Sequence, residues 1–189
     1  MFNHGGDLCL GFFKEMYEAG RVPIPQGARV LEVGCAEFDA CGPLKAARPD
    51  VHLTAVDWRK VDRPAADVLL QGNLLDQDLF PASSFDVILA VSVIEHVGIG
   101  RYQDPVVEDG DTQAMAHLRR WLRPSGLVYL DVPYRGAGRS TPFRAYSEAD
   151  LQRRVIAGWT EVDRQEFEGR QEGGDIHCDA PYIALVLRP

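Results

Sequence analysis

Short runs of β-branched and aliphatic residues recur along the chain, and helix-length connections separate most of them. Five such runs span residues 29–33, 51–57, 67–71, 84–92 and 127–132. Uninterrupted apolar runs of this length are typical of strands that are buried in a parallel sheet. Two closing runs, residues 160–167 and 182–187, are suited to pair with each other. The pattern therefore predicts an α/β protein with a parallel sheet.

Helical patterns occupy several of the intervening segments. Residues 7–21 have an apolar face, and Pro23 and Pro25 end that pattern. This helix either covers the sheet or closes over a bound ligand. Further helices are predicted over 37–48, from Asp111 as N-cap until the break at 124–126, and from Ser147 through 156.

Composition narrows the class of protein. The chain has 189 residues, 46% hydrophobic content and a formal charge of −8, which predicts one domain without broad nucleic-acid contact. The sequence has no apolar run long enough for a membrane span and no basic leader, so we expect a cytoplasmic protein that does not engage membranes. Its four cysteines are interpreted as free thiols, and its oligomeric state is left open.

The first strand and the turn after it form the clearest candidate site. Glu32 lies inside an apolar strand, and Gly34 ends that strand where a helix should begin. Ligands bind at such turns in doubly wound folds, although a plain strand-to-helix turn is the alternative. Asp57 ends the second strand, where a carboxylate can accept hydrogen bonds from a ribose diol or cap a loop.

Several motifs in order resemble those of class I S-adenosylmethionine-dependent methyltransferases. They are VLEVGCAEF, AVDWR, GNLLDQDLFPASSFDVILAVSVIEHV and HLRRWLRPSGLVYLDVP, spanning residues 29–133. The resemblance implies a Rossmann-like sheet of seven mostly parallel strands, with helices on both faces and the last strand antiparallel. It also implies one domain over 1–189, made of a covering helix (1–26), a cofactor-binding half (27–135) and a substrate-side half (136–189). The segment SVIEHVGIGRYQDPVVEDGD is similar to a methyltransferase-like family of unknown function first catalogued from nematodes.

The resemblance also implies roles for individual residues toward S-adenosylmethionine. Glu32, Gly34 and Ala36 would lie beside the methionine part and Asp57 would hold the ribose. Trp58 would pack near the adenine, Asn73 and Leu74 would meet its edge, and Ser92 would lie by the methionine end.

The glycine pattern after the first strand departs from that of the family. Where the family has further glycines, this chain has Ala36 and Phe38. A second hypothesis is therefore a catalytically silent member that binds the cofactor or a partner. The same spacing disfavours a dinucleotide-dependent dehydrogenase, because close approach of a pyrophosphate needs glycine.

Catalytic candidates follow the fourth strand. A hydroxyl acceptor must lose a proton, and His96 with Glu95 is our candidate general base. The alternative is that this pair caps the loop or positions the cofactor. A divalent metal held by Glu95, His96 and His177 is a further, less favoured alternative.

Candidate substrate contacts lie in two loops. Arg101 and Tyr102 belong to a glycine-containing segment suited to a lid, and Tyr134 and Arg135 follow the fifth strand. With Arg139 and Arg144, Arg135 either receives an anionic acceptor or is an ordinary surface side chain. We expect the acceptor to be a hydroxyl on a small molecule or sugar.

Overall fold

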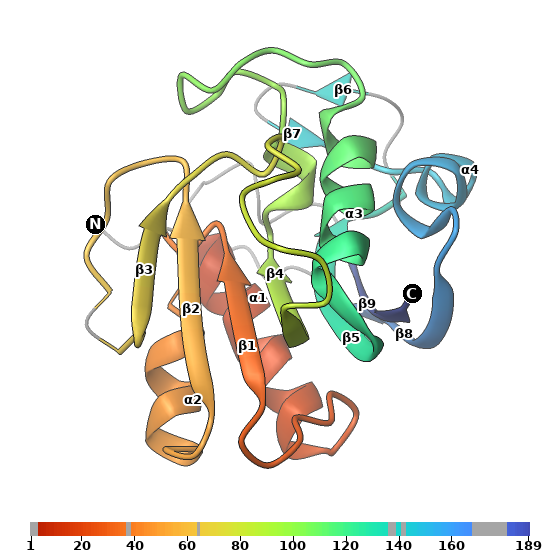
Figure 1. Cartoon of the computed structure of the whole chain (residues 1–189). Coiled ribbons are helices and arrows are strands. Elements are labelled where there is room, and N and C mark those ends of the chain that lie inside the picture. Colours follow the sequence, from red (N-terminus) through yellow and green to blue (C-terminus); the bar gives the residue numbers. More distant parts are fainter. Residues whose placement is uncertain (1–3, 37–38, 64, 136–138, 141–142, 168–180) are drawn as a thin grey trace.

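A computed structural model describes residues 4–36, 39–63, 65–135, 139–140, 143–167 and 181–189. Seven strands form one sheet in the order β3-β2-β1-β4-β5-β9-β8 (Figure 1). The first five pair in parallel, whereas β9 runs antiparallel to both β5 and β8. The predicted sheet is thus confirmed. The strands are β1 (Arg29–Val33), β2 (His52–Asp57), β3 (Val68–Gln71), β4 (Phe85–Val91), β5 (Leu122–Pro133), β8 (Thr160–Phe167) and β9 (Tyr182–Arg188).

Helices cover both faces of the sheet, as expected. Because successive side chains on a strand point to opposite faces, Val30 belongs to one apolar cluster and Leu31 to the other. The helices α1 (His4–Glu18) and α2 (Cys41–Ala47) pack on the first face. On the second face lie α3 (Gly110–Trp121) and a π-helical turn, η2 (Leu151–Ile156). Figure 1 shows α3 in front of the sheet and α1 behind it.

Two predicted element boundaries are wrong, for identifiable reasons. Asp109, not Asp111, occupies the N-cap position of α3. Asp111 lies in the first turn, fully buried, and accepts hydrogen bonds from Arg154 and the Tyr146 hydroxyl. β5 begins at Leu122 rather than at residue 127, because Leu122 pairs with Phe85 before the register shifts. A strand thus begins before the Pro-Ser-Gly sequence that was expected to separate helix from strand.

Other local predictions are refined. α2 is shorter than the helix expected over 37–48, and Glu37, its predicted start, lies outside the described residues. Ser147 does cap a helix, since its hydroxyl accepts a hydrogen bond from the amide of Asp150. That helix, α4 (Glu148–Asp150), widens at once into η2. A small hairpin of β6 (Arg139–Ser140) and β7 (Phe143–Arg144) was not predicted.

The topology brings the carboxyl ends of β1, β2, β3 and β4 together along one edge of the molecule. Parallel strands end side by side, so the loops that follow them meet there. A short 3-10 turn, η1 (Ile94–His96), follows β4 at this edge. Among the described helices, none combines the length and apolar character needed to cross a membrane.

Candidate functional site

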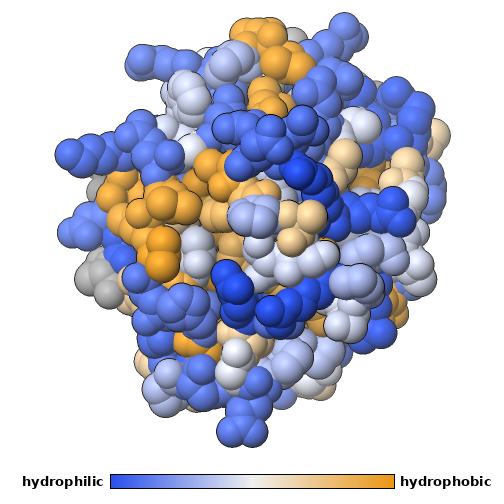
Figure 2. All heavy atoms as spheres, viewed as in Figure 1, coloured by the Kyte–Doolittle hydropathy of each residue, from blue (hydrophilic) through white to orange (hydrophobic). Residues whose placement is uncertain are grey.

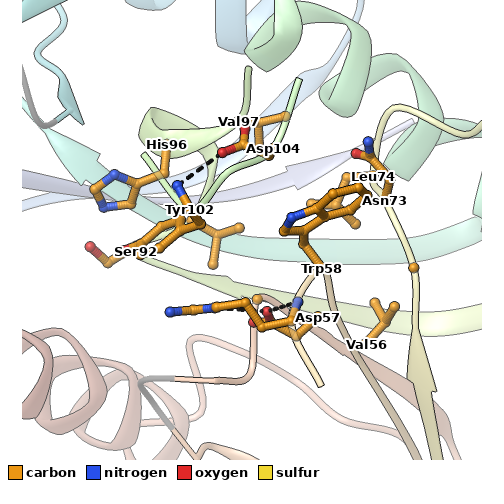
Figure 3. A pocket seen from close by; sticks show the side chains of 14 residues that line it. Val56, Asp57, Trp58, Asn73, Leu74, Ser92, His96, Val97, Tyr102 and Asp104 are labelled. Atoms are coloured by element: carbon orange, nitrogen blue, oxygen red, sulfur yellow. Dashed lines mark hydrogen bonds and ion pairs between the residues drawn. The ribbon is translucent and has the colours of Figure 1, made fainter. Parts of the chain in front are cut away.

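A cleft lies at the carboxyl ends of these four parallel strands (Figure 3). In the figure, Trp58, Asn73 and Leu74 lie on one side of the cleft, and Ser92 and His96 lie on the other. Each side chain follows a strand end, so the sheet itself holds their spacing. Six of the eight predicted cofactor-binding residues line this cleft: Gly34, Asp57, Trp58, Asn73, Leu74 and Ser92.

Gly34 is required by the backbone at the first strand end. Its φ of +69° lies in the left-handed region, and a Cβ there would come within 2.4 Å of a Val93 methyl carbon. The turn after β1 can therefore pack closely against the segment after β4 only with glycine. The sequence predicted a glycine at this turn so that a ligand could approach closely, and the structure shows Val93 as the close neighbour.

Glu32 and Ala36, the other two predicted cofactor contacts, do not line the cleft. The Glu32 carboxylate accepts hydrogen bonds from the amides of Ala40 and Cys41, at 2.8 and 3.1 Å. Burial raises the pKa of Glu32, while these amide donors act to lower it. Its carboxylate therefore orders the chain entering α2 from behind the cleft. The Ala36 amide donates to Asp57 Oδ2 at 3.0 Å, so Ala36 joins the turn after β1 to the end of β2.

Asp57 is the central acid on the Trp58 side of the cleft. Its side chain is nearly buried, and its Oδ1 atom accepts hydrogen bonds from the amide and the Nε of Arg59, at 2.8 and 3.1 Å. The described donors to this carboxylate are the amides of Ala36 and Arg59 and the Arg59 guanidinium. An ionised carboxylate has about four lone-pair sites, so further donors can be accepted. Beside it, the 39% exposed Trp58 provides an aromatic wall.

Arg59 connects the Asp57 side of the cleft to the loop after β4. Its guanidinium carbon lies 4.1 Å from the centre of the Tyr102 ring, within cation–π distance. Tyr102 is in turn held by its amide, which donates to Asp104 Oδ1. Sequence reasoning placed Tyr102 at the site but missed Arg59 and Asp104, both of which line the cleft.

The opposite side of the cleft is built on buried acids. Ser92, at a strained φ of +50°, donates from its hydroxyl to Glu95 Oε1 at 2.6 Å and from its amide to Asp131 Oδ1 at 3.0 Å. Both carboxyl groups are almost completely buried. Three buried polar atoms here have no hydrogen-bond partner among the described residues: Glu95 Oε2, Asp131 Oδ2 and the Tyr129 hydroxyl.

Burial shifts the pKa values of the Glu95 and Asp131 carboxyl groups toward neutral pH. Desolvation, reinforced by the nearby Asp131 charge, raises the pKa of Glu95 to about 8. Desolvation likewise raises the pKa of Asp131 to about 7. Cys9 of α1 lies against this pair, and burial together with Asp131 raises the pKa of its thiol. Acids with pKa values near the working pH are suited to proton transfer.

His96 stands beside this acidic pair at the cleft. Its Nε2 atom lies 3.8 Å from Glu95 Oε1, and its ring is edge-on to Tyr102 and Phe143. The imidazole thus has a carboxylate on one side and aromatic walls on others. The structure therefore brings the predicted catalytic pair together with the predicted substrate residue Tyr102; the neighbouring Arg101 lies 5.4 Å from the Tyr102 ring centre.

Other predicted substrate residues lie away from the cleft. Tyr134 donates from its hydroxyl to Glu148, and Arg135 pairs with Glu166 of β8. Arg144 was expected either to receive an anion or to lie at the surface, and the structure corrects both interpretations. It is buried and donates to the carbonyl oxygens of Val97, Val107 and Glu108, so it holds the loop after β4 in place. The side chain of Arg139 lies outside the described residues.

A metal site is not assembled by the described part of the chain, where no group of three or more histidine, cysteine or acidic side chains is suitably clustered. His177, the predicted third ligand, lies outside the described residues, as do Phe38 and Cys178. Cys9, Cys35 and Cys41 are free thiols, as expected, and all three are buried. Burial raises the pKa of Cys35 to about 12, which suits a packing role rather than a nucleophile.

Asp131 is the main residue that sequence reasoning missed. It lies inside the apolar run 127–132, just as Glu32 lies inside the first strand. A carboxylate in a buried strand needs a compensating partner or a function. That signal was used for Glu32 and was equally available for Asp131.

Comparison with solved structures reveals the fold family. A Burkholderia thailandensis 1,6-didemethyltoxoflavin-N1-methyltransferase, with S-adenosylhomocysteine bound, aligns with 97% of this chain and 77% of its own at TM-score 0.61 and 18% identity. The fold is that of the class I S-adenosylmethionine-dependent methyltransferases. A TehB-like S-adenosylmethionine-dependent methyltransferase from Corynebacterium glutamicum matches over 97% of both chains, at TM-score 0.59 and 18% identity.

Sequence comparisons give two further likenesses, one to a named methyltransferase and one to a family of unknown function. The 27-O-demethylrifamycin SV methyltransferase of Amycolatopsis mediterranei is 24% identical, over 89% of this chain and 73% of the relative. The profile of a family described as Caenorhabditis protein of unknown function, DUF268, matches residues 74–157. Both resemblances predicted from the motifs are thereby confirmed.

Proposed function

We propose that this chain is an S-adenosylmethionine-dependent methyltransferase whose acceptor is a hydroxyl group of a small molecule or sugar. The observation that carries the proposal is the meeting of Gly34, Asp57, Trp58, Asn73, Leu74 and Ser92 around one cleft at the carboxyl ends of the strands. Those residues were selected from motifs that lie far apart in the sequence. Their convergence supports a single cofactor site.

The chemistry of the cleft fits the proposed cofactor. Asp57 accepts hydrogen bonds only, as a vicinal diol requires, and Trp58 and Leu74 offer apolar surface for an adenine. Glu32 contributes by holding the chain around Ala40 and Cys41 in place behind the turn. When bound, S-adenosylmethionine supplies a methyl group on a positively charged sulfur.

At the other side of the cleft, we assign proton removal to the His96 imidazole, which would take the hydroxyl proton on a ring nitrogen, with the Glu95 carboxyl group beside it. The acceptor hydroxyl must be aligned with the methyl carbon and must lose its proton. His96 lies at the cleft, whereas Glu95 is reached through the Ser92 hydroxyl. Tyr102 and Arg101 would contact the acceptor, so part of the substrate side would lie within the proposed cofactor-binding half over 27–135 rather than in the proposed substrate-side half over 136–189.

The class of acceptor is supported by the relatives. The Amycolatopsis protein is named as a methyltransferase of 27-O-demethylrifamycin SV, and the Burkholderia structure contains 1,6-didemethyltoxoflavin. Both names refer to small molecules. The 24% identity to the rifamycin enzyme, together with an acid and a histidine at the cleft, favours an oxygen acceptor.

Calorimetry with S-adenosylhomocysteine tests the cofactor site. We expect binding by the wild-type chain, and a loss of about 10- to 100-fold in affinity for Asp57→Asn, since a charged hydrogen-bond acceptor is removed. Asp62→Asn is the matched control, because Asp62 is an exposed acid five residues away. Equal affinity of the wild type and Asp57→Asn for S-adenosylhomocysteine would show that Asp57 does not contact the cofactor.

The catalytic assignment needs a separate readout. A radiolabelled methyl-transfer screen over pooled metabolites should yield at least one labelled product with the wild-type chain. His96→Ala should then lower kcat by about 100-fold or more with little change in S-adenosylhomocysteine affinity. If activity disappeared on chelation and returned with magnesium, the metal alternative would replace the direct base assignment.

A catalytically silent cofactor- or partner-binding protein is the second candidate. It is favoured by Ala36, which takes the place of a family glycine and whose amide already occupies Asp57 Oδ2. A solved structure of the same fold, matched at TM-score 0.67 and 15% identity, is named a [4+2]-cyclase, so the fold is not tied to one reaction. A blank screen combined with tight S-adenosylhomocysteine binding would favour this candidate.

A further inference from the structure

Both oxygen atoms of the Asp57 carboxylate already accept hydrogen bonds. Oδ2 accepts one, from the Ala36 amide at 3.0 Å. Oδ1 accepts two, from the amide of Arg59 at 2.8 Å and from its Nε atom at 3.1 Å. Each oxygen of an ionised carboxylate has about two lone-pair sites. The donors among the described residues therefore fill Oδ1 and leave one site on Oδ2.

A ribose diol needs one acceptor site on each oxygen, because its two neighbouring hydroxyl groups would each donate to a different oxygen of the carboxylate. The second hydroxyl can bind to Oδ1 only if one of the two donors already there leaves. Asp57 is only 4% exposed and is held by two backbone amides, so the carboxylate itself stays in place.

The Arg59 guanidinium is the donor that can leave. The Arg59 amide belongs to the turn after β2, and removing it from Asp57 would require the backbone to move. The Nε contact is longer, and the Arg59 side chain is 33% exposed, so water can replace Asp57 as its partner. Figure 2 shows hydrophilic side chains at the surface where Figure 1 places the connection between β2 and β3, to which Arg59 belongs.

Tyr102 is covered by the same guanidinium. The guanidinium carbon lies over the Tyr102 ring, 4.1 Å from its centre. The loop that carries Tyr102 is fixed, because its amide and that of Gly98 donate to the two oxygens of Asp104 at 3.1 and 3.2 Å (Figure 3). Movement of Arg59 would therefore uncover the Tyr102 ring without opening the loop.

We propose that Arg59 is a positioning residue, which the cofactor's ribose displaces from Asp57 and which thereby uncovers the Tyr102 ring. The inference rests on the proposed function and deepens it. One ribose hydroxyl takes the place of Nε on Asp57 Oδ1, and the guanidinium moves off the ring. The uncovered ring face lies beside His96, whose ring centre is 5.6 Å from that of Tyr102. Cofactor binding thus prepares the acceptor side of the cleft.

Calorimetry with S-adenosylhomocysteine on Arg59→Met tests this role. Methionine keeps an unbranched apolar side chain but has no donor for Asp57. Because the ribose no longer competes with Nε, the affinity should rise about 3- to 10-fold above that of wild type. Lys60→Met is the matched control, since Lys60 is the next residue, is exposed and is not among the residues that line the cleft. Its affinity should equal that of wild type.

The outcomes separate this inference from the proposed function. Equal or weaker binding by Arg59→Met than by wild type would overturn the role of Arg59 and leave the cofactor site intact. An equal gain in Arg59→Met and Lys60→Met would also overturn it, because the gain would then reflect net charge. If neither wild type nor Arg59→Met bound S-adenosylhomocysteine, the proposed function would fail and this inference with it. Circular dichroism establishes that the variants are folded.

Nitrogen-15 NMR of the arginine side chains tests the displacement in the wild-type chain. On saturation with S-adenosylhomocysteine, the Arg59 Nε–H should exchange with water about threefold faster or more, because it loses its carboxylate partner. The Nε–H of Arg48, which donates to Asp50 at 2.7 Å, is the internal reference and should not change. Unchanged exchange at Arg59 with the ligand bound would contradict the displacement.

Discussion

The two sides of the cleft differ in how far their polar groups are satisfied. On the side proposed to bind the cofactor, Asp57 accepts hydrogen bonds at both oxygen atoms, and so does Glu32 of β1. On the other side, Glu95 and Asp131 each keep one buried oxygen without a partner among the described residues. The first arrangement is a rigid, preformed binding surface. The second stores unfavourable burial, and native proteins retain such groups mainly where chemistry requires them.

The sharpest way to test this contrast is the pH dependence of stability. The folded-state pKa values of Glu95 and Asp131, about 8 and about 7, lie above those of unfolded carboxyl groups. Between roughly pH 4 and pH 8 the folded chain therefore binds more protons than the unfolded chain. Stability should be greatest at the acidic end of this window, fall by several kcal/mol as the pH rises across it, and level off above about pH 8, where both carboxyl groups are ionised in the folded chain as well.

Urea unfolding from pH 5 to pH 9 measures that loss. Glu95→Gln and Asp131→Asn should each remove roughly half of the slope, since each deletes one buried titrating carboxyl. Asp76→Asn, at an exposed acid, is the control and should leave the slope unchanged. A stability that is flat with pH in the wild-type chain would mean that the acidic side of the cleft is not buried as described.

On the cofactor side, Gly34→Ala should be the most damaging small substitution. A left-handed φ and a 2.4 Å approach to Val93 both oppose a Cβ, so we expect a loss of roughly 2 to 4 kcal/mol of unfolding free energy. Gly11→Ala is the matched control, because nothing lies within 4 Å of a Cβ there and the residue is helical. That control should be neutral or stabilising by up to about 1 kcal/mol.

The contact that joins the two sides should have the smallest effect. Arg59 and Tyr102 form a partly exposed cation–π pair, for which a coupling of about 0.5 to 1 kcal/mol is expected. A double-mutant cycle with Arg59→Ala and Tyr102→Phe, read by urea unfolding, should measure little coupling, because phenylalanine keeps the ring that Arg59 contacts. The same cycle with Tyr102→Ala should yield the full value. A coupling free energy near zero in both cycles would show that the Arg59–Tyr102 contact does not link the two sides of the cleft energetically.

The sequence was sufficient to predict the sheet and to select six residues that line one cleft at its edge. Those features follow from apolar runs, from turn glycine and from acids at strand ends, all of which are local signals. The prediction was less successful for residues whose position and burial depend on tertiary contacts. Asp111 was misassigned because its burial against Arg154 and Tyr146 depends on residues 35 to 43 positions away.

Arg144, a candidate substrate residue, also shows that tertiary contacts cannot be predicted from the local sequence. Its three carbonyl partners, on Val97, Val107 and Glu108, are brought to it by the return of the chain after β5. Nothing in the local pattern separates a buried loop-holding arginine from an exposed one. The motif resemblance placed Ser92 near the cofactor, but its hydrogen bonds to the buried Glu95 and Asp131 carboxyl groups are recognisable only in the folded structure.

A crystal structure of the chain grown with S-adenosylhomocysteine tests the central claim most directly. The account predicts the nucleoside in the cleft at the carboxyl ends of β1, β2 and β4, with both ribose hydroxyls within about 3.2 Å of the Asp57 carboxylate and the adenine beside Trp58 and Leu74. Clear density for the ligand elsewhere, or a cleft without ligand under saturating conditions, would contradict it.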